Sequence, residues 1–139
     1  MHFGVSLFIK GDHLDLDEIS RTLGLSQTNI SRKGKRYGHA QELCDFDGWY
    51  YSPRIESTWL LDEHIMALWD AVRPHVGYLC DLKQKCEVSV SVHVTTSTLW
   101  FGREYQTRFE VDHRCMGLFT ELGIPCRVFV TITERVKEK

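Results

Sequence analysis

Hydrophobic and polar residues alternate in two stretches of this chain. Between residues 3 and 9 every second residue is Phe, Val, Leu or Ile, and between residues 88 and 94 every second residue is Val. A period of two places successive side chains on opposite faces of an extended strand. The second stretch has one apolar and one polar face, as in an antiparallel sheet with one face open to water. Residues 127–133 are predicted to form the last strand.

A first helix is predicted from residue 16. Leu16, Ile19 and Leu23 recur at intervals of three and four residues, and Asp15 with Glu18 forms an acidic capping pair in front of them. This spacing places the three apolar side chains on one face of a short amphipathic helix.

Two further helices follow the same reasoning. The longest apolar stripe runs from residue 61 to residue 79 in steps of three and four. We expect Asp62 to cap this helix and Pro74 to kink it, because proline interrupts the hydrogen-bond ladder. Asp112 is expected to cap a third helix that carries Cys115 and, at helical spacing, residues 118, 119 and 122.

Two of the helices end in the same short sequence motif. Leu23-Gly24-Leu25 closes the first, and Leu122-Gly123-Ile124 closes the third. A glycine in the left-handed conformation, followed by an apolar residue that folds back on the last turn, is a common helix stop. We therefore expect a positive φ at Gly24 and Gly123.

The remaining segments are less regular. Residues 26–47 show no period and are predicted to form a long functional or mobile loop. Residues 49–51 and 55–61 are predicted as short strands, and residues 99–111 as a strand with a turn near Gly102.

The order of elements indicates an α+β domain. We expect one largely antiparallel sheet with the helices on one face, a ferredoxin-like β-α-β-β-α-β order in the first part, and a single domain over residues 1–139. The common-face periodicity predicts a core made of Val5, Leu7, Ile19, Leu23, Ile65, Leu68, Val72, Val90, Val92, Leu118, Leu122, Val128 and Val130.

Several of these features occur together in a known family. They are the Leu23-Gly24-Leu25 helix stop, Thr28, residues 32–34, the Gly48-Trp49 pair, the Val-x-Val strand and the second helix stop at residues 122–124. With them the chain resembles a family of small bacterial proteins known as a domain of unknown function. The resemblance implies a bacterial intracellular α+β domain and no catalytic residue. Some small families of this kind are associated with immunity to neighbouring toxins.

Charge and cysteine content favour a cytoplasmic protein. The net charge of −2 provides no general attraction for nucleic acid or an anionic membrane. The five cysteines are odd in number and lack CxxC spacing, which favours reduced thiols over a disulfide framework. The first apolar run stops at Lys10, which is too short for a signal peptide or a membrane span.

The long loop carries the candidate binding residues. Its cationic stretch contains Arg32, Lys33, Lys35 and Arg36, followed by Tyr37, and could contact a protein or bind phosphate or RNA, or serve as a solvated connection. An acidic group of Glu42, Asp45 and Asp47 lies beside it and could face a basic partner. Trp49 is either covered core or an exposed anchor for a partner.

Motifs for chemistry are lacking in the sequence. We find no HExxH or zinc-like spacing, no nucleophile elbow and no glycine-rich phosphate loop, and we expect no metal and no cofactor. The sequence therefore favours a non-enzymatic binding protein, plausible as an immunity or antitoxin-type protein whose partner is a toxin encoded nearby. The alternative is a binder of nucleic acid or a phosphorylated ligand through residues 32–36. A third reading, an enzyme with a site assembled from distant residues such as His93, has the least support.

Overall fold

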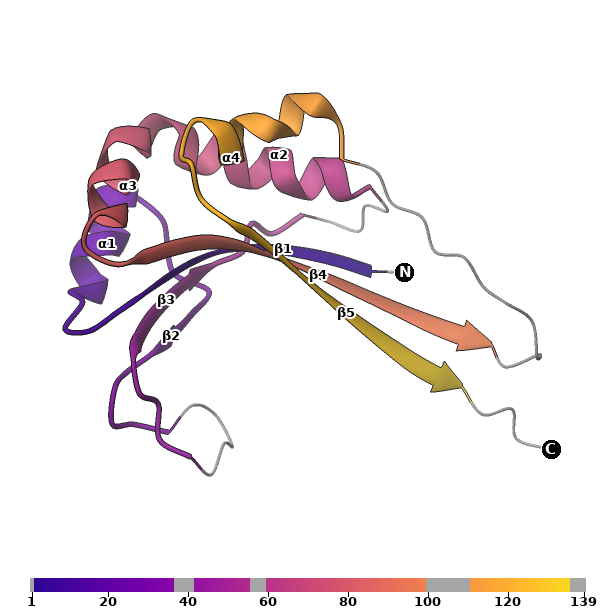
Figure 1. Cartoon of the computed structure of the whole chain (residues 1–139), viewed down its shortest axis with the longest axis horizontal. Coiled ribbons are helices and arrows are strands. Elements are labelled where there is room, and N and C mark those ends of the chain that lie inside the picture. The colour runs from indigo at the N-terminus through magenta and orange to yellow at the C-terminus, as the bar shows by residue number, and fades with distance from the viewer. Residues whose placement is uncertain (1, 37–41, 56–59, 100–110, 136–139) are drawn as a thin grey trace.

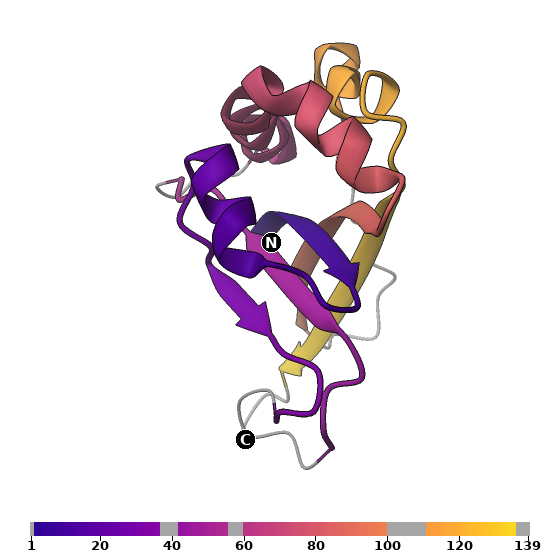
Figure 2. The same ribbon diagram turned by 90° about the vertical axis from the view of Figure 1, so that its left-hand side faces the viewer.

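The computed structural model describes residues 2–36, 42–55, 60–99 and 111–135. Its elements are β1 (His2–Gly11), α1 (Leu16–Leu23), β2 (Asn29–Ser31), β3 (Asp47–Tyr51), α2 (Leu61–Val72), the 3₁₀ turn η1 (Arg73–His75), α3 (Val76–Lys83), β4 (Glu87–Leu99), the 3₁₀ turn η2 (His113–Met116), α4 (Gly117–Thr120) and β5 (Cys126–Arg135). The strands form one sheet, and the helices cover one of its faces (Figures 1 and 2).

The strand order of the sheet is β2-β3-β1-β4-β5. The first four strands pair antiparallel throughout, and β5 pairs parallel to β4. Strand β1 is inserted between β3 and β4, and β3 between β2 and β1, as in a ferredoxin-like β-α-β-β-α-β unit. The predicted α+β class, the largely antiparallel sheet and the one-sided helix layer are confirmed. Strand β5 extends this unit at the β4 edge.

The end signals of α1 are confirmed in detail. The Asp15 carboxylate accepts a hydrogen bond from the Glu18 N–H at 3.0 Å. At the other end Gly24 has a φ of 66°, and the Leu25 N–H donates back to the Ser20 carbonyl at 3.2 Å. Gly123 has a φ of 60°. Both glycines therefore take the left-handed conformation that side chains with a Cβ rarely adopt.

The long helical stripe divides as Pro74 requires. Helix α2 ends at Val72, η1 contains the proline, and α3 continues the stripe to Leu79. The predicted cap of this helix is wrong, because the N-cap position is Leu60, two residues before Asp62, and the helix begins at Leu61. Asp62 lies inside the first turn, and its carboxylate accepts a hydrogen bond from the Asp112 N–H, just before η2. The cap predicted at Asp112 is confirmed: its side chain accepts from the Arg114 N–H at 2.9 Å.

Other segments differ from their predicted form. The stretch 26–47 is not without structure, because it contains β2 and a β-bridge between Arg36 and Leu43. The strand predicted over 55–61 is wrong at Leu61, which begins α2, and residues 56–59 lie outside the described part. The strand predicted over 99–111 falls on residues 100–110, which also lie outside it.

The core lies between the sheet and the helix layer. Of the thirteen predicted core residues the structure buries the first eleven, from Val5 to Leu122. Val128 and Val130 are corrections: their side chains are 51% and 55% exposed. They occupy the face of β5 that continues the buried face of β4, with Val92 opposite Val128. Strand β5 lies at one edge of the described sheet, however, and its far half extends past the helices (Figure 1).

Candidate functional site

The described residues between β2 and β3 form two paired arms. We call these residues, 32–36 and 42–46, the basic hairpin. Its two arms are joined by the Gly34 N–H, which donates to the Cys44 carbonyl at 2.8 Å, and by the Cys44 N–H, which donates to the Lys35 carbonyl at 2.9 Å. Gly34 permits the turn with a φ of 82°. The hairpin extends from the sheet on the side away from the helices (Figures 1 and 2).

Asp47 anchors the base of this hairpin. The residue is buried, and its Oδ1 accepts from the Lys33 N–H at 2.9 Å while its Oδ2 accepts from the Leu14 N–H at 3.1 Å. The hydrogen bond from Lys33, together with that from Leu14 and the charge of Arg32, lowers the pKa of Asp47. The carboxylate thus ties the hairpin to the turn before α1. Its predicted role as a surface contact for a partner is wrong, because both oxygens serve the fold.

The predicted cations all lie on the outside of the hairpin. Arg32, Lys33, Lys35 and Arg36 are exposed. The Lys33 ammonium lies 3.4 Å from the Asp12 carboxylate, and both side chains are more than half exposed. An ion pair of this kind adds little stability. The hairpin therefore presents a local positive surface although the net charge of the chain is −2.

The other predicted contacts are divided between surface and core. Glu42 and Asp45 are exposed on the returning arm, together with Leu43, whose side chain is 60% exposed. Tyr37 lies outside the described residues. Trp49 is completely buried, and its Nε1 donates to the Ser20 hydroxyl at 2.9 Å. The core reading of Trp49 is confirmed, and its reading as an exposed anchor is wrong.

The opposite face of β3 carries a different aromatic group. Tyr50 stacks on Phe8 of β1 with ring centres 4.5 Å apart and nearly parallel planes. Phe46 approaches Phe8 edge-on, and the Lys10 ammonium lies 4.5 Å from the Phe46 ring centre. These rings occupy the helix-free face of the sheet beside the hairpin and fill the space above Gly48, where an added Cβ would lie 3.1–3.2 Å from the rings of Tyr50 and Phe8.

A second surface was missed by the sequence patterns. Strand β5 exposes Val128, Phe129, Val130 and Ile132, each by about half or more. Beside it, between α2, α4 and the sheet, lies an apolar cleft of about 390 Å³, lined among others by Val111, Met116, Phe119 and Val128. No local signal could have revealed this surface, since an edge strand and a buried strand share the same alternation.

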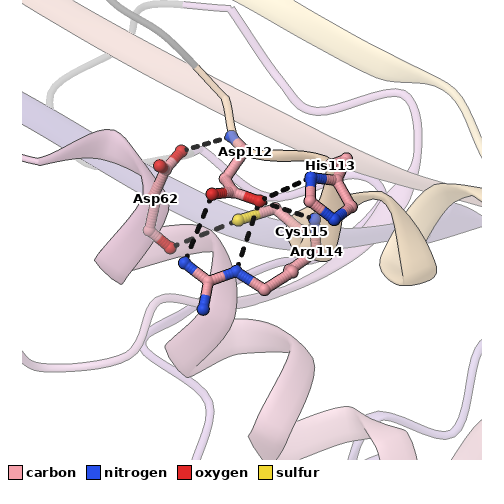
Figure 3. A network of polar contacts seen from close by, with 5 residues as sticks. All are labelled: Asp62, Asp112, His113, Arg114 and Cys115. Atoms are coloured by element: carbon pink, nitrogen blue, oxygen red, sulfur yellow. Dashed lines mark hydrogen bonds and ion pairs between the residues drawn. The ribbon is translucent and has the colours of Figure 1, made fainter.

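A polar network at the start of α2 contains a cysteine, a histidine and two carboxylates (Figure 3). The Asp112 N–H donates to the Asp62 carboxylate at 2.9 Å, and the Cys115 thiol points to the Asp62 carbonyl at 3.7 Å. His113 and Arg114 both face the Asp112 carboxylate. Burial, aided by Asp62 and Asp112, raises the pKa of the Cys115 thiol, which disfavours the nucleophilic thiolate. The network therefore serves to hold the start of η2 against the start of α2.

Within the described ranges there is no group of three or more His, Cys, Asp or Glu side chains that could hold a metal ion. Among those residues no helix is both long and apolar enough to cross a bilayer.

Comparison with known proteins identifies a family for the chain. No curated protein and no solved structure is similar to the chain at a significant level. A family model does match, over residues 1–131, which is nearly the whole chain, and its description is a domain of unknown function, DUF4279. The resemblance that the helix stops and the Val-x-Val strand suggested is thereby confirmed, and the chain belongs to the DUF4279 family.

Proposed function

We propose that this chain is a small, non-enzymatic bacterial binding protein of the immunity or antitoxin type, acting in the cytoplasm on a toxin encoded nearby. The observation that carries the proposal is the basic hairpin, which is fixed at its base by Asp47 and exposes Arg32, Lys35 and Arg36. A toxin surface with acidic groups is the partner that this hairpin suits.

The anchoring of the hairpin favours binding. Because the Asp47 carboxylate and the paired arms fix the main chain at the base of the hairpin, binding at Arg32 and Lys35 requires the ordering of side chains rather than of the backbone. Arginine is enriched at energetically important interface positions, where its planar group forms paired hydrogen bonds with carboxylates. Leu43 adds an exposed apolar contact between the charges.

The test uses the product of the neighbouring gene and two matched variants. The first replaces Arg32, Lys35 and Arg36 with serine. The control replaces Arg21, Arg54 and Lys85, which are also exposed but lie outside the hairpin, and so removes the same charge. We expect calorimetry to show at least tenfold weaker binding for the hairpin variant and unchanged binding for the control.

Two results would contradict this proposal. Equal affinity of the hairpin variant and the wild-type chain would remove the hairpin from the interface. Failure of the chain to bind the neighbouring gene product, and to protect cells that express it, would remove the immunity role.

A second candidate function rests on the same cations. Arg32, Lys35 and Arg36 lie within five residues and beside a glycine of positive φ, which suits phosphate or a nucleic-acid backbone. The net charge of −2 and the acidic residues Glu42 and Asp45 make this the less favoured role.

Salt dependence separates the two functions. A labelled oligonucleotide bound at about 50 mM salt should lose affinity steeply as salt increases if three phosphates are neutralised. The absence of oligonucleotide binding at that salt concentration would exclude the second function and leave the first one standing.

A further inference from the structure

Strand β5 forms an open edge in the described sheet. Edge strands in soluble proteins are usually protected by shortness, proline, bulges or charges that point inward. Between Cys126 and Ile132 the sequence offers no proline, and the one charged residue, Arg127, is paired with Glu87 of the neighbouring strand β4. Among the described residues, the stretch from Cys126 to Ile132 therefore offers none of these barriers to pairing with another strand.

The backbone of β5 presents hydrogen-bonding groups to that edge. The Val90 N–H of β4 donates to the Pro125 carbonyl at 3.0 Å, so the peptide groups of odd-numbered residues point toward β4. By alternation Val128, Val130 and Ile132 direct their N–H and C=O groups outward. The same residues carry the exposed apolar side chains on the helix-covered side of the sheet.

We infer that this edge binds a second copy of the chain, with the two β5 strands antiparallel about a two-fold axis at Val130. In this register Val130 faces Val130 of the second copy, and Val128 faces Ile132 of the second copy. The outward-facing N–H and C=O groups of even-numbered residues on one strand then meet those of even-numbered residues on the other. The two-fold axis also keeps both helix layers on the same face of a continuous sheet.

The side chains favour a second copy over an unrelated strand. Each chain has an apolar cleft of about 390 Å³ beside Val128, with Val111 and Met116 about 40% exposed at its side. Each chain also has Ile132, 60% exposed, in the second half of β5. The two-fold axis brings Ile132 of each copy to the cleft of the other. One surface thus supplies both halves of the contact, as an isologous interface requires.

The side chains on the helix-free face of β5 are also compatible with this register. Phe129, which stacks on His93 with ring centres 5.2 Å apart, faces Thr131 of the second copy. From Cys126 to Ile132 no two like charges oppose each other, because Arg127 is the one charged residue of that stretch.

Oligomeric state is the first test. The full chain, of 16.2 kDa, should sediment with twice that mass at high micromolar concentration. Val130→Lys places two ammonium groups against each other on the axis and should weaken self-association at least tenfold. Leu43→Lys is the matched control, because Leu43 is 60% exposed and Val130 is 55% exposed. A wild-type chain that stays monomeric, or a Val130→Lys dimer as tight as wild type, would overturn the inference.

A cross-linking test remains valid if Val130→Lys fails to fold. Directly opposed residues in a hydrogen-bonded antiparallel pair have Cα atoms about 5.5 Å apart, within the range for a disulfide. Val130→Cys should therefore give a covalent dimer on oxidation. Ile132→Cys, which faces Val128 of the second copy, and the wild-type chain with its native cysteines should not.

The pattern of cross-links also identifies other occupants. Equal cross-linking of both variants would indicate a different register and contradict the axis at Val130. A monomer whose β5 amides resist hydrogen exchange would show that another part of the same chain covers the edge, and would also contradict the second copy. Neither result would affect the basic hairpin, which lies on other strands.

Discussion

At one edge of the sheet, β2 contributes three residues and leads into a charged hairpin. At the other edge, β5 contributes ten residues and an apolar surface. The β2 edge is tied to the rest of the molecule by polar side chains, above all by Asp47 and by the bond from Trp49 to Ser20. The β5 edge is held by its ladder with β4. The β2 edge is therefore held by side-chain contacts with other parts of the chain. Strand β5, in contrast, has the apolar composition of an interior strand although it lies at an edge.

This difference shows how position within a sheet changes the role of the same residue type. Val92 and Val128 are partners in the register of β4 and β5 and lie on the same face, yet Val92 is 2% exposed and Val128 is 51% exposed. The helix layer covers Val92 fully, whereas at Val128 it leaves an open apolar cleft. The burial of a side chain on an antiparallel or mixed sheet therefore depends on the alternation of faces along the strand and also on which strands the helices cover.

The largest effect on stability is expected from an aromatic residue beside the β2 edge, and an aromatic residue on β5 provides the comparison. Trp49→Ala, beside β2, should lower the free energy of unfolding by about 3–5 kcal/mol, because it empties a fully buried site and leaves Ser20 without its indole partner. Phe129→Ala, on β5, should cost less than about 1 kcal/mol, because its ring is half exposed. Urea unfolding of both variants, below the concentration of self-association, measures the difference. Similar losses would show that β5 is covered in solution.

A smaller effect is expected at the anchor of the hairpin. Asp47→Asn keeps the shape of the side chain but turns an amide NH₂ toward one of the two N–H donors, and should cost about 2 kcal/mol at pH 7.

The effect of Asp47→Asn should depend on pH with a defined sign. The pKa of Asp47 is lower in the folded chain than the ordinary value of 3.8, so its contribution is complete above that value and is lost as the pH falls through the folded pKa. Unfolding free energies measured at pH 7, 4 and 2.5 should therefore converge between variant and wild type at the acidic end. A difference that does not change with pH would contradict the role of the carboxylate charge.

A third prediction compares two glycines on the helix-free face. An added Cβ at Gly48 would lie 2.5 Å from the Ser31 hydroxyl oxygen and close to two aromatic rings, whereas at Gly4 the nearest atom is 4.0 Å away. Gly48→Ala should cost about 1–3 kcal/mol through overpacking. Gly4→Ala, the control, should cost less than about 0.5 kcal/mol. Equal melting temperatures of the two variants would show that the sheet beside β2 can relax.

The sequence predicted local features well, because they depend on neighbouring residues. The Asp15 cap, the glycine stops at Gly24 and Gly123 and the break at Pro74 all follow from interactions within one or two turns. Periodicity also identified core residues correctly, because eleven of the thirteen that it predicted are buried.

The predictions failed where contacts between residues far apart in the sequence determine the structure. The exposure of Val128 and Val130 depends on the position of β5 in the sheet. Asp47 looked like one of three surface carboxylates until the fold placed it opposite Leu14, more than thirty residues earlier. Of the candidate site, the exposed cations could be predicted, whereas the apolar surface of β5 could not.

The smallest effect on stability is expected from the cations of the hairpin. Replacement of Arg32, Lys35 and Arg36 by serine should change the free energy of unfolding by less than about 0.5 kcal/mol, as is usual for exposed side chains. The reason is that Asp47 holds the hairpin through the main-chain N–H of Lys33, and the arms are joined by main-chain bonds. These hydrogen bonds use none of the three side chains, and Arg32 acts on Asp47 only through its charge. Urea unfolding beside the Arg21, Arg54 and Lys85 control measures this directly. A loss above about 1 kcal/mol in the hairpin variant alone would show that the charges stabilise the hairpin itself. Unchanged stability would instead allow any lost affinity for a partner to be assigned to the exposed cations.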